Sequence, residues 1–385
     1  MTKHESVHRT KKYAEVDMKK VFSCLLILCL FSYGCQKKED VIRIGIAGPM
    51  TGDQAKLGMD LKNGASLAVE EWNSKGGLLG MKIEMIVSDD QHDPKQAVSL
   101  ANKMVNDGVV GVIGHFNSSC SIPASDVYNR SGIPMITPGS TNPQLTEKGY
   151  RGVLRVCGRD DQQGRVGAEF ASKYLRLKRV AILHDKTTYG QGLADEFRRF
   201  LGDDVNVVFY GSVVQGDKDF KPVLTAVKTK NPELIFFGGI YPEAGLLVKQ
   251  SREIGLNVSF MSGDGTIDPK FIEIAGASAA EGTYLTFSPD PKNIPSAQGF
   301  IEKYGSKFGE IGPYSIYAYD ATNILLSAIE EAKTTDAKAI IEKLHSMEFE
   351  VALGNIQFNE KGDVTVSPFV VWITKDGKFE EYWKP

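Results

Sequence analysis

The 385-residue sequence has little cysteine and little histidine, with five and six residues respectively. Two cysteines lie in an apolar segment near the amino terminus, and the other three, Cys35, Cys120 and Cys157, are too few for a disulfide scaffold. The spacing of Cys120 and Cys157 permits either a disulfide or two free thiols. The histidines are far apart in the sequence, which argues against a zinc site. We therefore expect a fold that depends on its hydrophobic core and binds no metal.

The sequence also lacks a run of about 20 apolar residues, the length that a membrane-spanning helix needs. It has no Gly-x-Ser-x-Gly elbow, no Walker loop, no His-Glu-x-x-His and no Gly-x-Gly-x-x-Gly after a strand. The segment Tyr189-Gly190-Gln191-Gly192 is only a fragment of a phosphate loop. These absences favour a binding protein over an enzyme, and no cofactor is expected.

Neither sign of charge dominates, because the formal net charge is −3. Residues 1–34 contain six Lys or Arg and three Asp or Glu, so the rest of the chain is weakly acidic. A nucleic-acid-binding surface needs clustered positive charge, and that class of partner is excluded. With 42% hydrophobic and 24% charged residues, the composition is that of a soluble globular protein, and the length favours two domains.

The amino-terminal segment has the pattern of an export signal. Met18-Lys19-Lys20 is a basic start, Val21 to Phe31 is apolar, and small residues precede Cys35. We predict a signal peptide over 1–34, with Met18 as the expected start of translation. Ser32-Tyr33-Gly34-Cys35 resembles a bacterial lipobox, which implies a lipid anchor at Cys35. Ser32 departs from the usual leucine, and ordinary signal cleavage is the alternative.

Strand and helix patterns alternate from Val41 onward. The cycle starts again after about Gly158, with no low-complexity linker between the halves. This alternation predicts an α/β protein with two doubly wound, parallel-sheet lobes. The expected strands are 41–47, 82–87, 109–113, 134–136, 179–184, 205–210 and 234–237, and the expected helices cover 61–72, 94–105, 118–128 and 192–201.

Two hydroxyl-rich turns follow predicted strands, at Val112 to Ser119 and at Met135 to Pro143. Ligands of open α/β sheets bind beyond the carboxyl ends of the strands, where helix amino termini expose N–H groups that favour a carboxylate. The residues alone leave an alternative open, in which Ser118 only caps its helix and Thr141 only shapes a turn.

From about Val41 to its end, the sequence resembles the type I periplasmic binding proteins, specifically the leucine–isoleucine–valine-binding proteins of ABC importers. Several motifs occur in the same order as in that family. The matching stretches are 89–90, 93–97, 109–119, 123–126, 135–143, 184–186 with 189–190, 238–243 and 359–363.

The resemblance implies a ligand site for an amino acid. It assigns the ligand α-carboxylate to Ser118 and Thr141, and the α-ammonium to the Gly139 carbonyl, the Thr141 hydroxyl and Asp264. Without it, Asp264 would be interpreted as a turn residue and the tyrosines as half-buried aromatics. The other predicted contacts are Leu57, Phe116, Asn117, Ser140, Tyr189 and Tyr241.

The sequence departs from the family at several positions. His92 and Asn117 replace a cysteine pair that many relatives carry, so that disulfide is missing. Leu57 stands where a relative has an aromatic residue, and Ile240 where a tyrosine is frequent. Gly312 replaces a bulky apolar residue and is expected to make room for a larger ligand side chain, while Asn117 adds a polar contact.

The resemblance also implies the domain organisation and the function. The amino-terminal lobe is expected to contain 40–158 and 288–367, and the carboxy-terminal lobe 159–287 and 368–385, with a hinge of three crossings near 158, 288 and 368. The implied function is that of a monomeric, periplasmic or cell-envelope component of an ABC importer, which captures a branched-chain or other small amino acid and presents it to the permease. An alternative is a sensor subunit that reports amino acids or related anions to a receptor, while an exported enzyme has no support from motifs.

Overall fold

The computed structural model describes residues 41–385. The predicted signal peptide and Cys35 lie outside the described residues. Among those that are described, no helix has both the length and the apolar character needed to cross a membrane.

A five-stranded parallel sheet forms the first half of the fold, with the order β2-β1-β3-β4-β5. Each of the first four strands leads into a helix, as the alternating pattern predicts. The strands are β1 (Val41–Gly48), β2 (Lys82–Asp89), β3 (Gly111–Ile113), β4 (Met135–Thr137) and β5 (Val153–Arg155), and the helices are α2 (Ala55–Ser74), α3 (Pro94–Asn106), α4 (Ser118–Ser131) and α5 (Gln144–Glu147).

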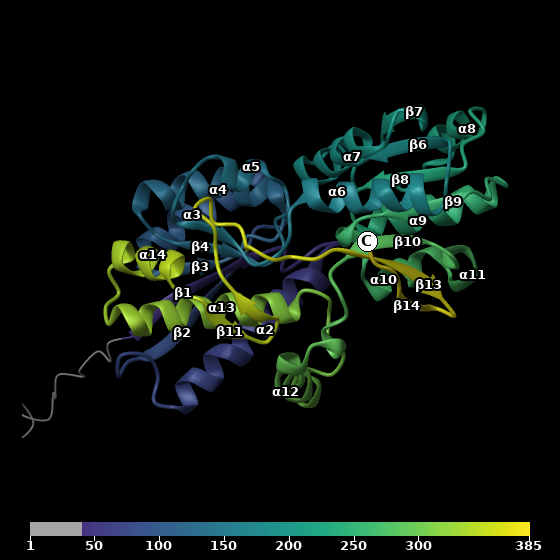
Figure 1. The fold of residues 1–385 in the computed structure, drawn as a ribbon. Helices are drawn as coiled ribbons and strands as arrows, with labels where there is room; N and C mark the ends of the chain where they lie inside the picture. The colour runs from purple at the N-terminus through teal and green to yellow at the C-terminus, as the bar shows by residue number, and fades with distance from the viewer. Residues whose placement is uncertain (1–40) are drawn as a thin grey trace, which may run out of the picture. The chain divides into compact units, whose positions relative to one another are not determined.

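Alternate residues of these strands point to opposite faces of the sheet. Val112 and Met135 pack with residues of α3 and α4, whereas Ile113 and Ile136 belong to the core that contains α2 and α13 (Ser315–Ala332). Helix α13 lies beside α2 (Figure 1), and Gly64 permits the close approach, because a Cβ at that position would lie 2.1 Å from the Ser315 carbonyl oxygen. Both faces of the sheet are therefore covered by helices.

A seven-stranded sheet forms the second half, in the order β14-β13-β10-β9-β8-β6-β7. Its last two strands in the sequence, β13 and β14, are antiparallel to their neighbours, which differs from the fully parallel sheet we predicted. A two-residue turn joins β13 to β14, and a connection this short can only link antiparallel strands. The strands are β6 (Arg179–His184), β7 (Asn206–Ser212), β8 (Leu234–Gly238), β9 (Ser259–Ser262), β10 (Tyr284–Phe287), β13 (Val370–Lys375) and β14 (Lys378–Trp383), and the helices are α6 (Asp160–Glu169), α7 (Thr188–Phe200), α8 (Lys221–Lys228), α9 (Tyr241–Glu253), α10 (Pro269–Ala275) and α11 (Ala277–Ala280).

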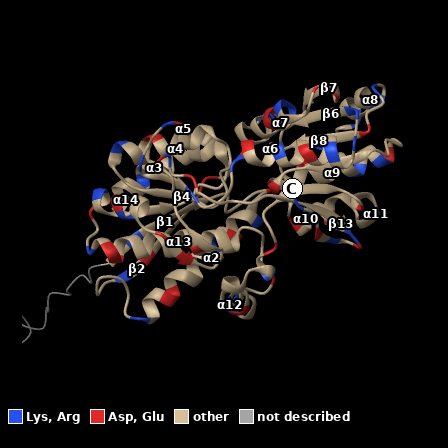
Figure 2. Ribbon diagram, viewed as in Figure 1, with Lys and Arg blue, Asp and Glu red and all other residues tan. Residues whose placement is uncertain are grey.

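The chain passes between these halves more than once. After β10 it returns to the first sheet as α12 (Gln298–Phe308), α13, α14 (Ala337–Ser346), β11 (Phe349–Val351) and β12 (Gly354–Ile356), and then adds β13 and β14 to the second sheet. We call the five-stranded sheet with α2–α5 and α12–α14 the first lobe, and the seven-stranded sheet with α6–α11 the second lobe. In both lobes, acidic and basic residues alternate over the ribbon (Figure 2).

The predicted α/β architecture of two doubly wound lobes is confirmed. Strand β6 has the predicted bounds, and Asp93 caps α3 by accepting hydrogen bonds from the N–H groups of Lys95 and Gln96. Helix α7 begins four residues earlier than predicted, at Thr188, because the Thr187 side chain caps it through the N–H of Gly190.

Candidate functional site

The turns after β3 and β4 lie against each other at the carboxyl edge of the first sheet. The Ser118 hydroxyl accepts a hydrogen bond from the N–H of Asn142 at 3.3 Å, so it does not simply cap its own helix. Gly139 lies under the Phe116 ring, since a Cβ there would approach that ring to 2.5 Å. The buried Thr141 hydroxyl has no protein partner.

Ser140 has a different environment from its neighbour Thr141. Its hydroxyl donates to the Phe116 carbonyl at 2.8 Å and lies 2.6 Å from the Ser121 hydroxyl. The Ser140 side chain therefore links the two turns, while the Thr141 hydroxyl is left for another partner.

Asp264 and Tyr189 meet on the second lobe, as the resemblance implies. The Tyr189 hydroxyl donates to Asp264 Oδ1 at 2.8 Å and accepts from the N–H of Gly265. Tyr314, which precedes α13 in the first lobe, donates to Asp264 Oδ2 at 2.8 Å and packs edge-on against Phe116. The two lobes thus contact each other at Asp264. Burial raises the pKa of this carboxyl despite the two hydroxyl donors.

Asp160 is a buried residue of this region that the sequence analysis missed. It is the first residue of α6, its N–H donates to the Thr141 carbonyl at 2.9 Å, and neither carboxylate oxygen has a protein partner. Burial and the nearby Asp264 charge raise its pKa well above the ordinary value, although the neighbouring Thr141 hydroxyl and the Arg155 charge act to lower it. Ligands of open α/β sheets bind beyond the carboxyl ends of the strands, which is why the turns after β3 and β4 were singled out. The same rule applies to Asp160, because α6 follows the carboxyl end of β5.

These two carboxyl groups have no counter-charge among the described residues of the ligand-free protein, and burial disfavours their ionised forms. Asp160 and Asp264 are fully enclosed, and neither forms an ion pair with any residue from 41 to 385. An unpaired buried carboxylate is costly and strongly favours a cationic partner. The arrangement therefore suits a ligand with a positive group near Thr141.

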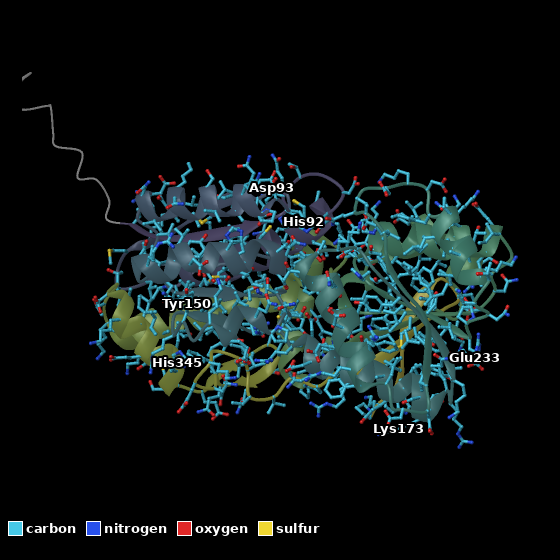
Figure 3. All side chains as sticks on the ribbon, turned by 90° about the horizontal axis from the view of Figure 1, so that it is seen from above. His92, Asp93, Tyr150, Lys173, Glu233 and His345 are labelled. Atoms are coloured by element: carbon cyan, nitrogen blue, oxygen red, sulfur yellow. The ribbon has the colours of Figure 1, made fainter. Side chains whose placement is uncertain are left out.

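His92 and Asn117, which replace the cysteine pair of the family, are joined through a third residue. Asn117 Nδ2 donates to Gln54 Oε1 at 2.8 Å, and Gln54 Nε2 lies 2.6 Å from His92 Nδ1. His92 precedes Asp93, the cap of α3 (Figure 3). The side-chain oxygen of Asn117, Oδ1, is buried and has no hydrogen-bond partner among the described residues.

Of the remaining predicted contacts, Tyr241 lies at the boundary between the lobes and Leu57 lies in the core of the first lobe. Leu57 is buried on α2, and Ile240 caps α9. The Tyr241 hydroxyl donates to the carbonyl of Asp53, which connects α9 of the second lobe to the loop before α2. Tyr241 therefore bridges the lobes directly. A polar cavity of about 390 Å³ at this boundary is lined by residues that include Gln54, His92 and Ile240.

The space expected beside Gly312 is already occupied. A Cβ at Gly312 would lie 2.0 Å from both carboxylate oxygens of Asp60, a buried residue of α2. Asp60 Oδ1 pairs with Lys56 Nζ at 2.6 Å, whereas Oδ2 has no partner. Gly312 makes room for a carboxylate of the protein itself, so our expectation of additional space for the ligand was wrong.

The thiols of Cys120 and Cys157 are free and buried. Burial raises the pKa of Cys157 to about 12, so its thiol is un-ionised at neutral pH. Within residues 41–385, no group of three or more His, Cys, Asp or Glu side chains is arranged to hold a metal ion.

Comparison with known proteins identifies the family. The family described as periplasmic binding protein matches residues 41–378. The chain belongs to the periplasmic binding protein family. This membership confirms the predicted class, a binding protein and not an enzyme, and implies a periplasmic location.

Relatives of this periplasmic binding protein match nearly its whole length. An amino acid binding protein of Pseudomonas aeruginosa is 43% identical, covering 89% of this chain and 92% of its own. A Leu/Ile/Val-binding protein homolog of Brucella abortus is 40% identical, with 95% and 100% covered. The similarity thus extends through both lobes.

Solved structures share the fold. The leucine binding protein LivK of Thermotoga maritima has a TM-score of 0.84 at 33% identity, covering 89% of this chain and 99% of its own. LivJ of Streptococcus pneumoniae, in complex with isoleucine, has a TM-score of 0.83 at 29% identity, with 90% and 100% covered.

Proposed function

We propose that this protein binds an α-amino acid of the branched-chain or small aliphatic class between its lobes and presents it to the permease of an ABC importer. The observation that carries this proposal is the pair of buried carboxylates, Asp160 and Asp264, which lie beside an unpartnered Thr141 hydroxyl and have no cationic partner among the described residues. A zwitterionic ligand supplies the missing positive charge.

In the proposed complex, the ligand α-ammonium lies between Asp160 and Asp264 and donates to the Gly139 carbonyl. The ligand α-carboxylate accepts from the hydroxyls of Ser118 and Thr141, aided by the amino terminus of α4. Each charge of a zwitterion that leaves water then has a hydrogen-bonding partner, as burial of a charge requires.

The other contacts form the remaining walls of the proposed site. Phe116 and Tyr189 pack beside the two charged groups, Ser140 holds the turn, and Leu57 and Asn117 face the ligand side chain. Tyr241 closes the boundary between the lobes through Asp53.

To release its ligand to the permease, the protein must open the space between its lobes. We propose that the three crossings between the lobes form the hinge for this opening. The first lobe would comprise 40–158 and 288–367, the second 159–287 and 368–385, with the crossings near 158, 288 and 368. Ligand binding on the first lobe would favour closure, which brings Asp264 and Tyr189 over the ligand. A monomer suffices for this mechanism.

We also propose that the protein is anchored to the membrane by a lipid on Cys35. Mass spectrometry of the membrane fraction would identify a lipidated Cys35 as the first residue. A Cys35→Ser variant should be released into the soluble fraction, and a parent protein that is already soluble would contradict the anchor.

A thermal-shift screen of residues 36–385 against the twenty amino acids and common small anions tests the ligand proposal. A ligand at a thousand times its Kd stabilises the folded state by about 4.1 kcal/mol. We expect large increases in Tm with leucine, isoleucine or valine. If no amino acid raises the Tm and an anion without an ammonium group does, the proposed ligand class is wrong.

A further inference from the structure

Arg155 at the end of β5 is the one Lys or Arg side chain in residues 41–385 that is fully buried. Its guanidinium Nη1 donates to the Ser140 carbonyl at 2.6 Å, and Nη2 donates to the Asn142 carbonyl at 3.0 Å. These carbonyls lie on either side of Thr141. Arg155 thus holds the backbone on both sides of Thr141 without contacting the Thr141 hydroxyl.

The same guanidinium is fixed by an acidic residue far away in the sequence. Arg155 Nε donates to Asp363 Oδ1 at 2.7 Å, and the Thr146 hydroxyl, which also contacts Nη2, donates to the same oxygen at 2.8 Å. Arg159 pairs with Asp363 Oδ2 at 2.8 Å. Through Arg155, the carbonyls on either side of Thr141 are thus connected to Asp363, and Arg159 and Thr146 hold the same carboxylate.

Residues 359–363 form a turn that packs against β5. The backbone of Asn359 and Asp363 closes a turn by a 2.8 Å hydrogen bond, and the N–H of Arg155 donates to the Gly362 carbonyl at 3.0 Å. Gly362 has a φ of +94°, and a Cβ there would lie 2.2 Å from the Val153 carbonyl oxygen. Only glycine fits this contact with β5.

We propose that Arg155 is a positioning residue for the ligand carboxylate site, and that its pair with Asp363 holds the guanidinium in the orientation that fixes the Thr141 turn. This inference rests on the proposed function for the role of Thr141. A planar guanidinium reaches two carbonyls and a carboxylate at once, which a lysine ammonium cannot do with the same geometry.

The test compares Arg155→Lys with Arg252→Lys. Arg252 is a matched control, because its guanidinium also donates to two backbone carbonyls, those of Leu256 and Val258, but in the second lobe. Hydrogen exchange of the ligand-free proteins is measured first. We expect Arg155→Lys to accelerate exchange at the amides of 139–142 by about tenfold or more, while β1 and β6 are unchanged.

Ligand affinity is then measured by calorimetry with L-leucine, L-isoleucine and L-valine. Arg155→Lys should weaken binding by about tenfold or more, and Arg252→Lys by less than about threefold. In a double-mutant cycle with Thr141→Ala, the effect of Arg155→Lys should shrink to below about threefold, because the group it positions has been removed.

Three outcomes would overturn the inference: unchanged exchange at 139–142, uniform acceleration across both lobes, or additive effects in the cycle. If Arg155→Lys does not fold, Asp363→Asn replaces it and should produce the same local acceleration. Failure of the parent to bind any of the three amino acids would count against the proposed function alone, since exchange still decides whether Arg155 positions the turn.

Discussion

At the scale of single residues, the site is defined by polar atoms that the folded protein leaves without partners. Asp160 presents two such oxygens and Thr141 a hydroxyl, whereas Ser140 beside it is fully hydrogen-bonded. Unsatisfied buried groups cost stability. The oxygens of Thr141 and Asp160 come together where the turns after β4 and β5 meet, which indicates a place where a ligand completes the structure.

Asp160→Asn should have opposite effects on stability and binding. Because the pKa of Asp160 is raised in the folded state, its stabilising contribution is present only at low pH and is lost as the pH rises through the folded pKa. At pH 7 the asparagine variant should therefore melt at a higher temperature without ligand, while losing about 3–5 kcal/mol of affinity. Calorimetry and thermal melting test both effects.

Asp161→Asn is the control for this change. Asp161 is adjacent in the sequence but pairs with Arg159 near the surface, so its replacement should leave ligand affinity within about threefold of the parent. Equal losses for the two variants would remove Asp160 from the ligand site.

Thr141→Val and Ser140→Ala should separate binding from folding. Thr141→Val removes a hydroxyl that has no protein partner, so affinity should fall by about 1.5–3 kcal/mol with no loss of Tm in the ligand-free protein. Ser140→Ala removes a bond to the Phe116 carbonyl and should lower that Tm. A lower Tm for Thr141→Val with unchanged affinity would return Thr141 to a purely structural role.

At the scale of elements, close contacts between backbone segments position the site. Gly312, before α13, lies against the carboxylate of Asp60 on α2, and Gly64 on α2 lies against the backbone of α13. Tyr314, between Gly312 and α13, is held where its hydroxyl donates to Asp264. A side chain at Gly64 would force the two helices apart, whereas one at Gly312 would displace the Asp60 carboxylate.

Gly312→Ala should destabilise the protein by about 1–3 kcal/mol, because the added methyl group overlaps the Asp60 carboxylate. In an Asp60→Ala background the same change should cost much less. Denaturant unfolding of the four proteins measures this coupling. Equal costs in both backgrounds would mean that Asp60 does not occupy the space beside Gly312.

At the scale of the whole molecule, several buried carboxyl groups set the pH dependence of stability. Burial raises the pKa of Asp60 and Asp185 to about 6 and that of Asp320 to about 7. The folded protein therefore holds protons at pH 5–7 that the unfolded chain has released. His92 and His184, with lowered pKa values, act in the opposite direction but are fewer.

The ligand-free protein should accordingly lose stability as the pH rises from 5 to 8. Each raised carboxyl contributes stability that is complete below its unfolded pKa and is lost as the pH passes its folded pKa. Thermal melting at constant ionic strength tests this, and Asp60→Asn should reduce the slope. A Tm that is constant or rises across the range would contradict the prediction.

The sequence by itself determined the alternation of strands and helices, the two lobes and the turns after β3 and β4. Hydrophobic periodicity and turn chemistry are local properties, so the bounds of β6 and the Asp93 cap could be predicted from them. The family resemblance added the prediction that Ser118, Thr141 and Asp264 contact the ligand. The antiparallel β13 and β14 were missed, because pairing direction depends on how distant strands meet.

Only the tertiary structure decided which polar groups are left unpaired. Tyr314 and Arg155 lie apart in the sequence from the groups they contact, and no local pattern distinguishes them from surface residues. The position of Asp160 after β5 can be predicted from the sequence, but its burial without a partner cannot. The same holds for Asp60, which occupies the space beside Gly312 from another helix. Whether a carboxylate is solvated, paired within the protein or left to pair with a ligand depends on the atoms that enclose it. Only folding brings those atoms together.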